Sequence, residues 1–151
     1  MEVEKIKMVR LLKIIEEVKE LPDYLYHVTA EQNLPNIKKD GLEPKQSESS
    51  SDGVYLSDDE FTAANYANMR PSVDHILLKI DTSYLTKKKL SSDDYELVDF
   101  LERNGWKIGE KKYYSLEDVS WKESLEYVNQ VIYKDVVPYE AIEIKKSKFL
   151  P

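Results

Sequence analysis

The sequence contains no cysteine among its 151 residues. This absence excludes disulfide bonds, thiol catalysis and cysteine-based zinc sites, and it fits a reducing compartment such as the cytoplasm. No apolar run approaches the roughly 20 residues that span a bilayer, and the charged N-terminus is unlike a signal peptide. We therefore expect a cytoplasmic domain with no membrane partner.

Glycine is scarce, with four copies in the chain. The glycine-rich phosphate loops G-x-G-x-x-G and G-x-x-x-x-G-K-[ST] are absent. The two histidines, His27 and His75, are too far apart in sequence to form a local metal pair, so we expect no metal cofactor. Lys and Arg total 22 against 29 Asp and Glu. The resulting net charge of −7 argues against a general nucleic-acid binder.

The hydrophobic pattern predicts one α+β domain over residues 1–151, with an N-terminal helix in residues 1–21 and a core in residues 22–151. Helices and strands do not alternate as in a βαβ series, so we expect a split sheet of mixed or antiparallel strands with short helices. Strands are predicted at 24–28, 54–56, 76–80, 130–133 and 141–144. Short helices are predicted at 33–41, 61–69, 91–104 and 120–128, and a polar loop at 45–52. Capping boxes at Ser57–Glu60 and Ser120–Glu123 and the run Ser91–Asp94 are predicted to start three of these helices, and Gly41 to end the first with a left-handed cap.

Residues 25–66 carry the most informative pattern in the chain. Leu25-Tyr26-His27 lies on a predicted strand, and the helix after it ends at Gly41-Leu42. Gly53-Val54-Tyr55-Leu56 forms the next strand, and Ala64-Asn65-Tyr66 lies on the following helix. An imidazole and two tyrosines are thus presented by two successive strands and the helix that follows the second strand.

These motifs, in this order, resemble the ADP-ribosyltransferase superfamily, in the His–Tyr–Glu branch that includes the poly(ADP-ribose) polymerases and diphtheria-type toxins. The resemblance implies that NAD is the substrate and that His27 binds a ribose hydroxyl. Tyr55 and Tyr66 would sandwich the nicotinamide ring, a geometry that aromatic faces favour. Val28 and Thr29 complete the implied NAD-binding set, with backbone groups of Val28 on the nicotinamide amide.

The chain departs from that family at three positions. The usual glycine is Val28 here, and the usual serine is Ala63. The catalytic glutamate falls at the start of a late strand, where this chain has Gln130. Glutamine keeps a hydrogen bond but brings no charge, so Glu123 or Glu126, just upstream, is the alternative source of a carboxylate.

The resemblance implies a catalytic set of His27, Tyr55 and Gln130 in a mono-ADP-ribosyltransferase, a glycosyltransferase that releases nicotinamide and modifies a macromolecule. A protein acceptor is expected over a nucleic acid, and a toxin, a phage-encoded modifier or a regulatory enzyme would all fit. One alternative is an RNA 2'-phosphotransferase, a relative whose chemistry favours several arginines, of which the chain has three. Another is a catalytically silent NAD- or nucleotide-binding module, an interpretation that Gln130 supports.

Overall fold

The computed structural model describes residues 20–44, 53–69, 71–105, 120–147 and 149–150. Most of the predicted N-terminal helix, the polar loop at 45–52 and the segment from 106 to 114 lie outside these described residues.

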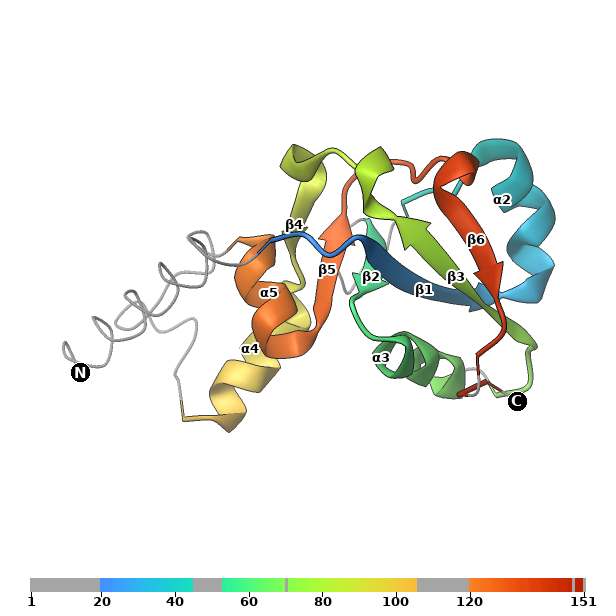
Figure 1. Ribbon diagram of the computed structural model, residues 1–151. Helices are drawn as coiled ribbons and strands as arrows, with labels where there is room; N and C mark the ends of the chain where they lie inside the picture. The colour runs from blue at the N-terminus through green and yellow to red at the C-terminus, as the bar shows by residue number, and fades with distance from the viewer. Residues whose placement is uncertain (1–19, 45–52, 70, 106–119, 148, 151) are drawn as a thin grey trace.

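The described part of the chain is built on one six-stranded sheet with the order β4-β5-β2-β1-β3-β6 (Figure 1). Every neighbouring pair in this sheet is antiparallel. The predicted α+β class is confirmed, and the sheet is antiparallel rather than mixed. Its strands are β1 (Tyr24–Ala30), β2 (Val54–Ser57), β3 (His75–Asp81), β4 (Leu90–Ser92), β5 (Gln130–Tyr133) and β6 (Ile142–Lys145).

Short helices pack around this sheet. The α-helices are α2 (Leu34–Asp40), α3 (Glu60–Asn65), α4 (Asp94–Arg103) and α5 (Trp121–Val128). The 3₁₀ turns are η1 (Glu31–Asn33), η2 (Tyr66–Met69), η3 (Thr82–Tyr84), η4 (Lys87–Lys89) and η6 (Tyr139–Ala141). Helix α5 packs on α4, β4 and β5, whereas α3 packs on β1 and β2 (Figure 1). None of the described helices is long and apolar enough to cross a membrane.

Helix starts follow side-chain capping, and the predicted cap at Ser57 is wrong. Ser57 belongs to β2, and Asp59 caps α3 by accepting a hydrogen bond from the N–H of Phe61. Ser91 and its neighbours form the short strand β4, and Asp93 caps α4. A carboxylate can do the work of a serine hydroxyl at an N-cap, so a run of several capping residues does not fix where the helix begins.

Two other predicted helix ends agree in position with the structure. The capping box of Ser120 and Glu123 opens α5 as predicted. Gly41 ends α2 with a φ of 78° and a ψ of −173°, which is a positive-φ turn rather than a left-handed helical cap. A Cβ there would lie 2.5 Å from the carbonyl oxygen of Val137, so glycine lets the end of α2 lie against that segment.

The core lies where apolar side chains of the sheet meet the helices. Its fully buried members include Leu25 from β1, Leu56 from β2, Leu78 and Ile80 from β3 and Val131 from β5. Complete burial of five such side chains from four strands fixes the register of the sheet, because a one-residue slip would turn them to the other face.

Strands β1 and β2 separate soon after they meet. Their paired position is Tyr26 with Ser57, whereas β1 pairs with β3 along all seven of its residues. Beyond Tyr26 the end of β1 therefore runs beside β2 without a backbone ladder. The predicted split of the sheet is seen here, and the candidate site lies in this gap.

Candidate active site

A cavity of about 350 Å³ lies at the separation of β1 and β2. That volume is at the small end of the range for small-molecule sites. Residues from β1, η1, β2, α3, η2 and β3 surround it. They are Tyr26, His27, Val28, Thr29, Ala30, Asn33, Tyr55, Ser57, Ala63, Tyr66, Met69 and His75, and we call this space the first cavity.

His27 bridges the gap between the two strands. Its Nδ1 lies 2.7 Å from the backbone carbonyl oxygen of Tyr55. A carbonyl oxygen only accepts, so Nδ1 carries a proton, and in the neutral form of the ring Nε2 is the acceptor. The imidazole is thereby fixed in both orientation and tautomer, with one nitrogen able to accept from a hydroxyl.

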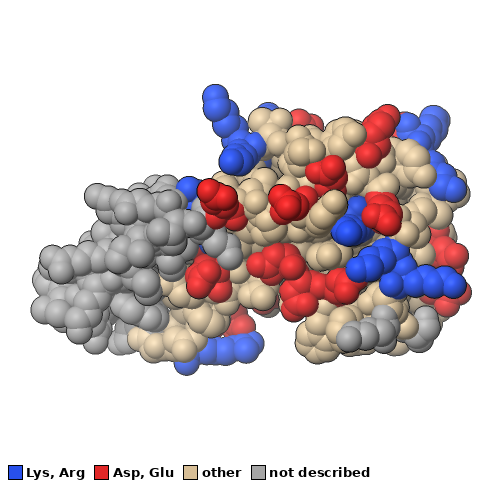
Figure 2. Space-filling view, in the orientation of Figure 1, with Lys and Arg blue, Asp and Glu red and all other residues tan. Residues whose placement is uncertain are grey.

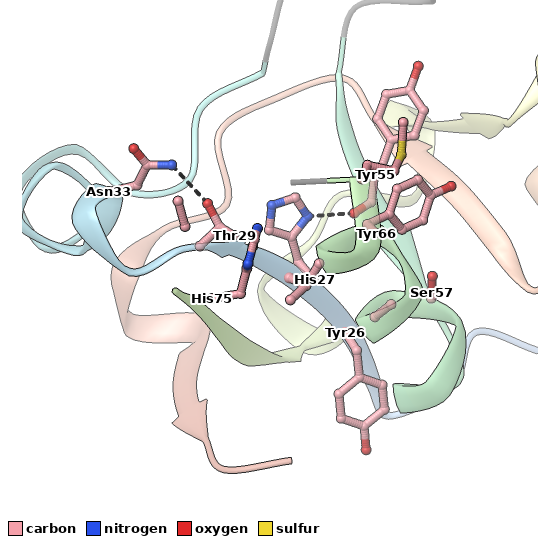
Figure 3. Close-up of a pocket in the computed structure, with 12 residues that line it drawn as sticks. Tyr26, His27, Thr29, Asn33, Tyr55, Ser57, Tyr66 and His75 are labelled. Atoms are coloured by element: carbon pink, nitrogen blue, oxygen red, sulfur yellow. Dashed lines mark hydrogen bonds between the residues drawn. The ribbon is translucent and has the colours of Figure 1, made fainter. Parts of the chain in front are cut away.

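Figure 3 shows how the other polar and aromatic side chains surround this ring. The His27 ring lies between Thr29 on one side and Tyr55 and Tyr66 on the other, while Tyr26 points away. Successive side chains on a strand face opposite ways, so His27 and Thr29 share one face of β1 and Tyr26 takes the other. The hydroxyl of Thr29 accepts a hydrogen bond of 3.0 Å from the Asn33 side-chain amide, an alternative to a helix cap.

Tyr66 and Gln130 form a reciprocal pair beside this cavity. The Tyr66 hydroxyl donates to Oε1 of Gln130 at 2.7 Å, and Nε2 of Gln130 lies 2.6 Å from the same hydroxyl. Gln130 is only 4% exposed. Burial, followed by the carboxylates of Asp93 and Glu96, raises the pKa of Tyr66 well above its usual value, so the phenol stays protonated.

A second cavity of about 330 Å³ adjoins the first, since Tyr66 and Met69 line both. Its other described lining residues are Thr62, Asn65, Glu96, Val128 and Gln130. The Tyr66–Gln130 pair therefore lies where the two spaces meet.

Behind this pair, two buried hydrogen bonds link Asp93 to Gln130 through Ser124. The backbone N–H of Asp93 donates to Oγ of Ser124 at 2.9 Å, and that hydroxyl donates to the carbonyl oxygen of Gln130 at 2.5 Å. Oδ1 of Asp93 accepts from the N–H of Glu96, whereas the buried Oδ2 has no hydrogen-bond partner among the described residues. Burial, with smaller contributions from Glu96 and Asp94, raises the pKa of Asp93 to about 6.

The structure brings together the site residues predicted from the sequence. Gln130 lines the second cavity and bonds to Tyr66, which lines both cavities. His27, Val28, Thr29, Tyr55 and Tyr66 all line the first cavity. No finding tests their individual roles, which remain predictions.

The two alternative carboxylates lie elsewhere. Glu123 is buried and accepts from the backbone N–H of Ser120, so it serves the start of α5. Glu126 is exposed and is not among the described residues that line either cavity. The carboxylate that does line the second cavity is Glu96 on α4, and no sequence motif identifies it.

His75 is a further residue at the site that no motif identifies. The predicted strand 76–80 excludes it, but it is the first residue of β3, pairs with Ala30 and lines the first cavity. Among the described residues no cluster of three or more histidine, aspartate or glutamate side chains could hold a metal ion.

Comparison with known proteins identifies the family. Residues 1–95 match the family described as RNA 2'-phosphotransferase, Tpt1 / KptA family. A probable RNA 2'-phosphotransferase of Fusobacterium nucleatum subsp. nucleatum is 40% identical over 91 residues, which cover 56% of this chain and 48% of that relative. The chain thus spans about half the length of the curated relative it matches. The family match contains the whole 25–66 pattern and ends before Gln130.

The match overturns the predicted placement in the His–Tyr–Glu branch of ADP-ribosyltransferases. The predictions of a mono-ADP-ribosyltransferase, of glycosyltransferase class, and of a poly(ADP-ribose) polymerase-like or toxin role are wrong. These predictions failed because the 25–66 motifs identify residues that line a cavity. The same lining can serve related reactions that transfer different groups. The alternative that was ranked lower is the one supported: the chain belongs to the RNA 2'-phosphotransferase, Tpt1 / KptA family.

Proposed function

We propose that this protein removes a 2'-phosphate from RNA and transfers it to NAD, with release of nicotinamide. The observation that carries this proposal is the first cavity, where a tautomer-fixed His27 lies beside Tyr55 and Tyr66 within the part of the chain that matches the family. An RNA substrate replaces the protein acceptor that the sequence favoured.

The first cavity suits the nicotinamide end of NAD. The faces of Tyr55 and Tyr66 offer stacking surfaces for a flat heteroaromatic ring. Nε2 of His27 is the acceptor for a ribose hydroxyl, because Nδ1 is engaged by the Tyr55 carbonyl. These contacts would orient the ribose so that the carbon bonded to nicotinamide faces the incoming phosphate.

The neutral side chain of Gln130 fits a phosphate nucleophile. In the first step a phosphate oxygen bonds to that ribose carbon while the bond to nicotinamide breaks and its electron pair leaves with the ring. The ribose carbon gains positive charge as the bond breaks, and such charge is stabilised by a nearby anion. The attacking phosphate brings its own negative charge, so a carboxylate at position 130 is not required. In a second step, a hydroxyl of the same ribose would attack the phosphorus and the bond to the RNA 2'-oxygen would break. The hydroxyl proton would pass to that oxygen, so the RNA leaves with a 2'-hydroxyl and the phosphate stays on the ADP-ribose.

The described surface offers little general attraction for RNA. Figure 2 shows acidic side chains across the middle of one face, with Lys and Arg side chains at its margins and beside the acidic ones on the right. Arg103 pairs with Asp99 at the end of α4, and Arg10 and Arg70 lie outside the described residues. Recognition of RNA would therefore depend on local contacts at the site rather than on a basic stripe.

The test uses the full chain, NAD and a short RNA that carries one internal 2'-phosphate. We expect the RNA to lose one phosphate by mass spectrometry while nicotinamide appears in equal amount. His27→Ala should abolish the reaction, whereas Glu102→Gln, an exposed change on α4, should not. NAD binding without any change in the RNA would instead support a silent NAD-binding module.

A further inference from the structure

The second cavity has no part in the proposed binding of NAD. It adjoins the first cavity across Tyr66 and Met69 and has a similar volume, about 330 Å³ against 350 Å³. A reaction between two substrates needs a place for the second one next to the reacting atoms. The second cavity lies at that position, next to the first.

Its lining is rich in hydrogen-bonding groups and poor in positive charge. Thr62, Asn65, Glu96 and Gln130 contribute a hydroxyl, two amides and a carboxylate, and no Lys, Arg or His is among its described lining residues. Asp93, buried nearby, and Glu96 both raise the pKa of Tyr66, which shows that negative charge lies close to the shared wall.

The negative charge near the second cavity determines which part of an RNA nucleotide could bind there. A phosphate placed beside Glu96 would be repelled by a like charge that is screened only partly near the surface. A ribose hydroxyl or a base amino group would instead donate a charge-assisted hydrogen bond to the same carboxylate. The cavity is therefore suited to the neutral portion of a nucleotide.

We propose that the second cavity binds the nucleoside of the RNA substrate, with Glu96 accepting from its hydroxyl or amino groups. The 2'-phosphate would then extend past Tyr66 into the first cavity. The inference rests on the proposed function for the identity of the ligand, and it assigns Glu96 a specificity role that the sequence did not suggest.

Side-chain amide resonances test the location of the ligand. Asn65 lines the second cavity and Asn33 the first, while Asn68, exposed on η2, lines neither described cavity. A trinucleotide RNA with a central 2'-phosphate, added without NAD, should shift the Asn65 signal and leave Asn68 unchanged. NAD alone should shift Asn33. An RNA-bound protein whose Asn65 signal does not move would overturn the proposal.

Two matched variants test the role of the carboxylate. Glu96→Gln should weaken binding of the same RNA about tenfold or more, the effect of losing a hydrogen bond to a charged group, while the affinity for NAD stays unchanged. Glu102→Gln on the same helix removes an exposed charge and corrects for general repulsion of RNA. Equal effects of the two changes, or tighter binding by Glu96→Gln, would show that no nucleoside donor meets Glu96.

The two proposals fail in different ways. If the wild-type protein leaves the 2'-phosphate on RNA but Asn65 still responds to the trinucleotide, the reaction is wrong and the cavity assignment stands. If the phosphate is removed while Asn65 is silent, the RNA binds elsewhere and the assignment of the second cavity is wrong.

Discussion

Tyr66 and Gln130 lie 64 residues apart in the sequence and hold one another through two hydrogen-bonding contacts of 2.7 and 2.6 Å. Tyr66 is the first residue of η2, directly after α3, and Gln130 opens β5, so the pair joins η2 to the strand next to β2. Because the pKa of Tyr66 is raised, its hydroxyl keeps the proton that it donates. These contacts hold the Tyr66 and Gln130 side chains in one arrangement where the two cavities meet.

Removing the hydroxyl of Tyr66 should destabilise the protein. Tyr66→Phe leaves the carboxamide of Gln130, which is 4% exposed, without the partner seen here. An unsatisfied buried polar group costs about 1–3 kcal/mol, so the free energy of unfolding in urea should fall by that amount. Tyr95→Phe, at a side chain that is 72% exposed, is the control and should be neutral within about 0.5 kcal/mol. Equal stability of the two variants would argue against the pair.

A carboxylate at position 130 should impair the proposed reaction. Gln130→Glu places a negative charge beside the path of an anionic phosphate, and we expect kcat/KM for 2'-phosphorylated RNA to fall about tenfold at pH 7.5. Burial and the nearby Asp93 would raise the pKa of the introduced carboxyl, so it becomes neutral as the pH falls and the deficit should shrink at pH 5. A rate that rises at pH 7.5 would instead indicate a neutral acceptor and contradict the phosphate nucleophile.

The sequence predicted the strands better than the caps. The apolar runs at 76–80 and 130–133 became β3 and β5 because alternating or buried β-branched residues have few other ways to pack. The short strand β4 at Leu90–Ser92 was missed, since its serines are equally suited to capping α4. Its pairing with β5, a contact distant in sequence, is what makes these residues a strand rather than the start of the helix.

The candidate site was predicted in part for a similar reason. His27, Tyr55 and Tyr66 stand out because strand and helix motifs surround them, and the structure places them around one cavity. Glu96 is one acidic residue on an ordinary amphipathic helix, and only the packing of α4 against α5 brings it to the second cavity. The transferred group depends on chemistry outside the 25–66 pattern, so the motifs could not choose between related reactions.

Ser124 should act as a structural link to Gln130. Its hydroxyl is fully buried, accepts from the Asp93 N–H and donates to the Gln130 carbonyl. Ser124→Ala leaves both backbone groups without this partner, and we expect a loss of about 1–3 kcal/mol in the free energy of unfolding. Ser83→Ala, at an exposed serine on η3, is the matched control. A Ser124→Ala protein as stable as its control would show that the two hydrogen bonds of Ser124 add nothing to the free energy of unfolding.

Asp93 should make the protein less stable as the pH rises through about 6. Its pKa is raised from 3.8 to about 6, so between these values the folded state holds a proton that the unfolded chain releases. Stability therefore declines from pH 4 to pH 7 on account of this group. One pKa unit corresponds to about 1.4 kcal/mol, and with partial solvent screening we expect Asp93 to contribute about 1–2 kcal/mol to that decline.

Asp93→Asn isolates this contribution. The amide oxygen can still accept from the N–H of Glu96 and cap α4, while the buried charge is removed. Urea unfolding at pH 4.5 and pH 7.5 should show the variant gaining stability relative to the wild type as the pH rises. Asp99→Asn, farther along α4 at an exposed ion pair with Arg103, is the control for a general loss of negative charge. If the difference between wild type and Asp93→Asn is the same at both pH values, the Asp93 carboxyl does not titrate near 6.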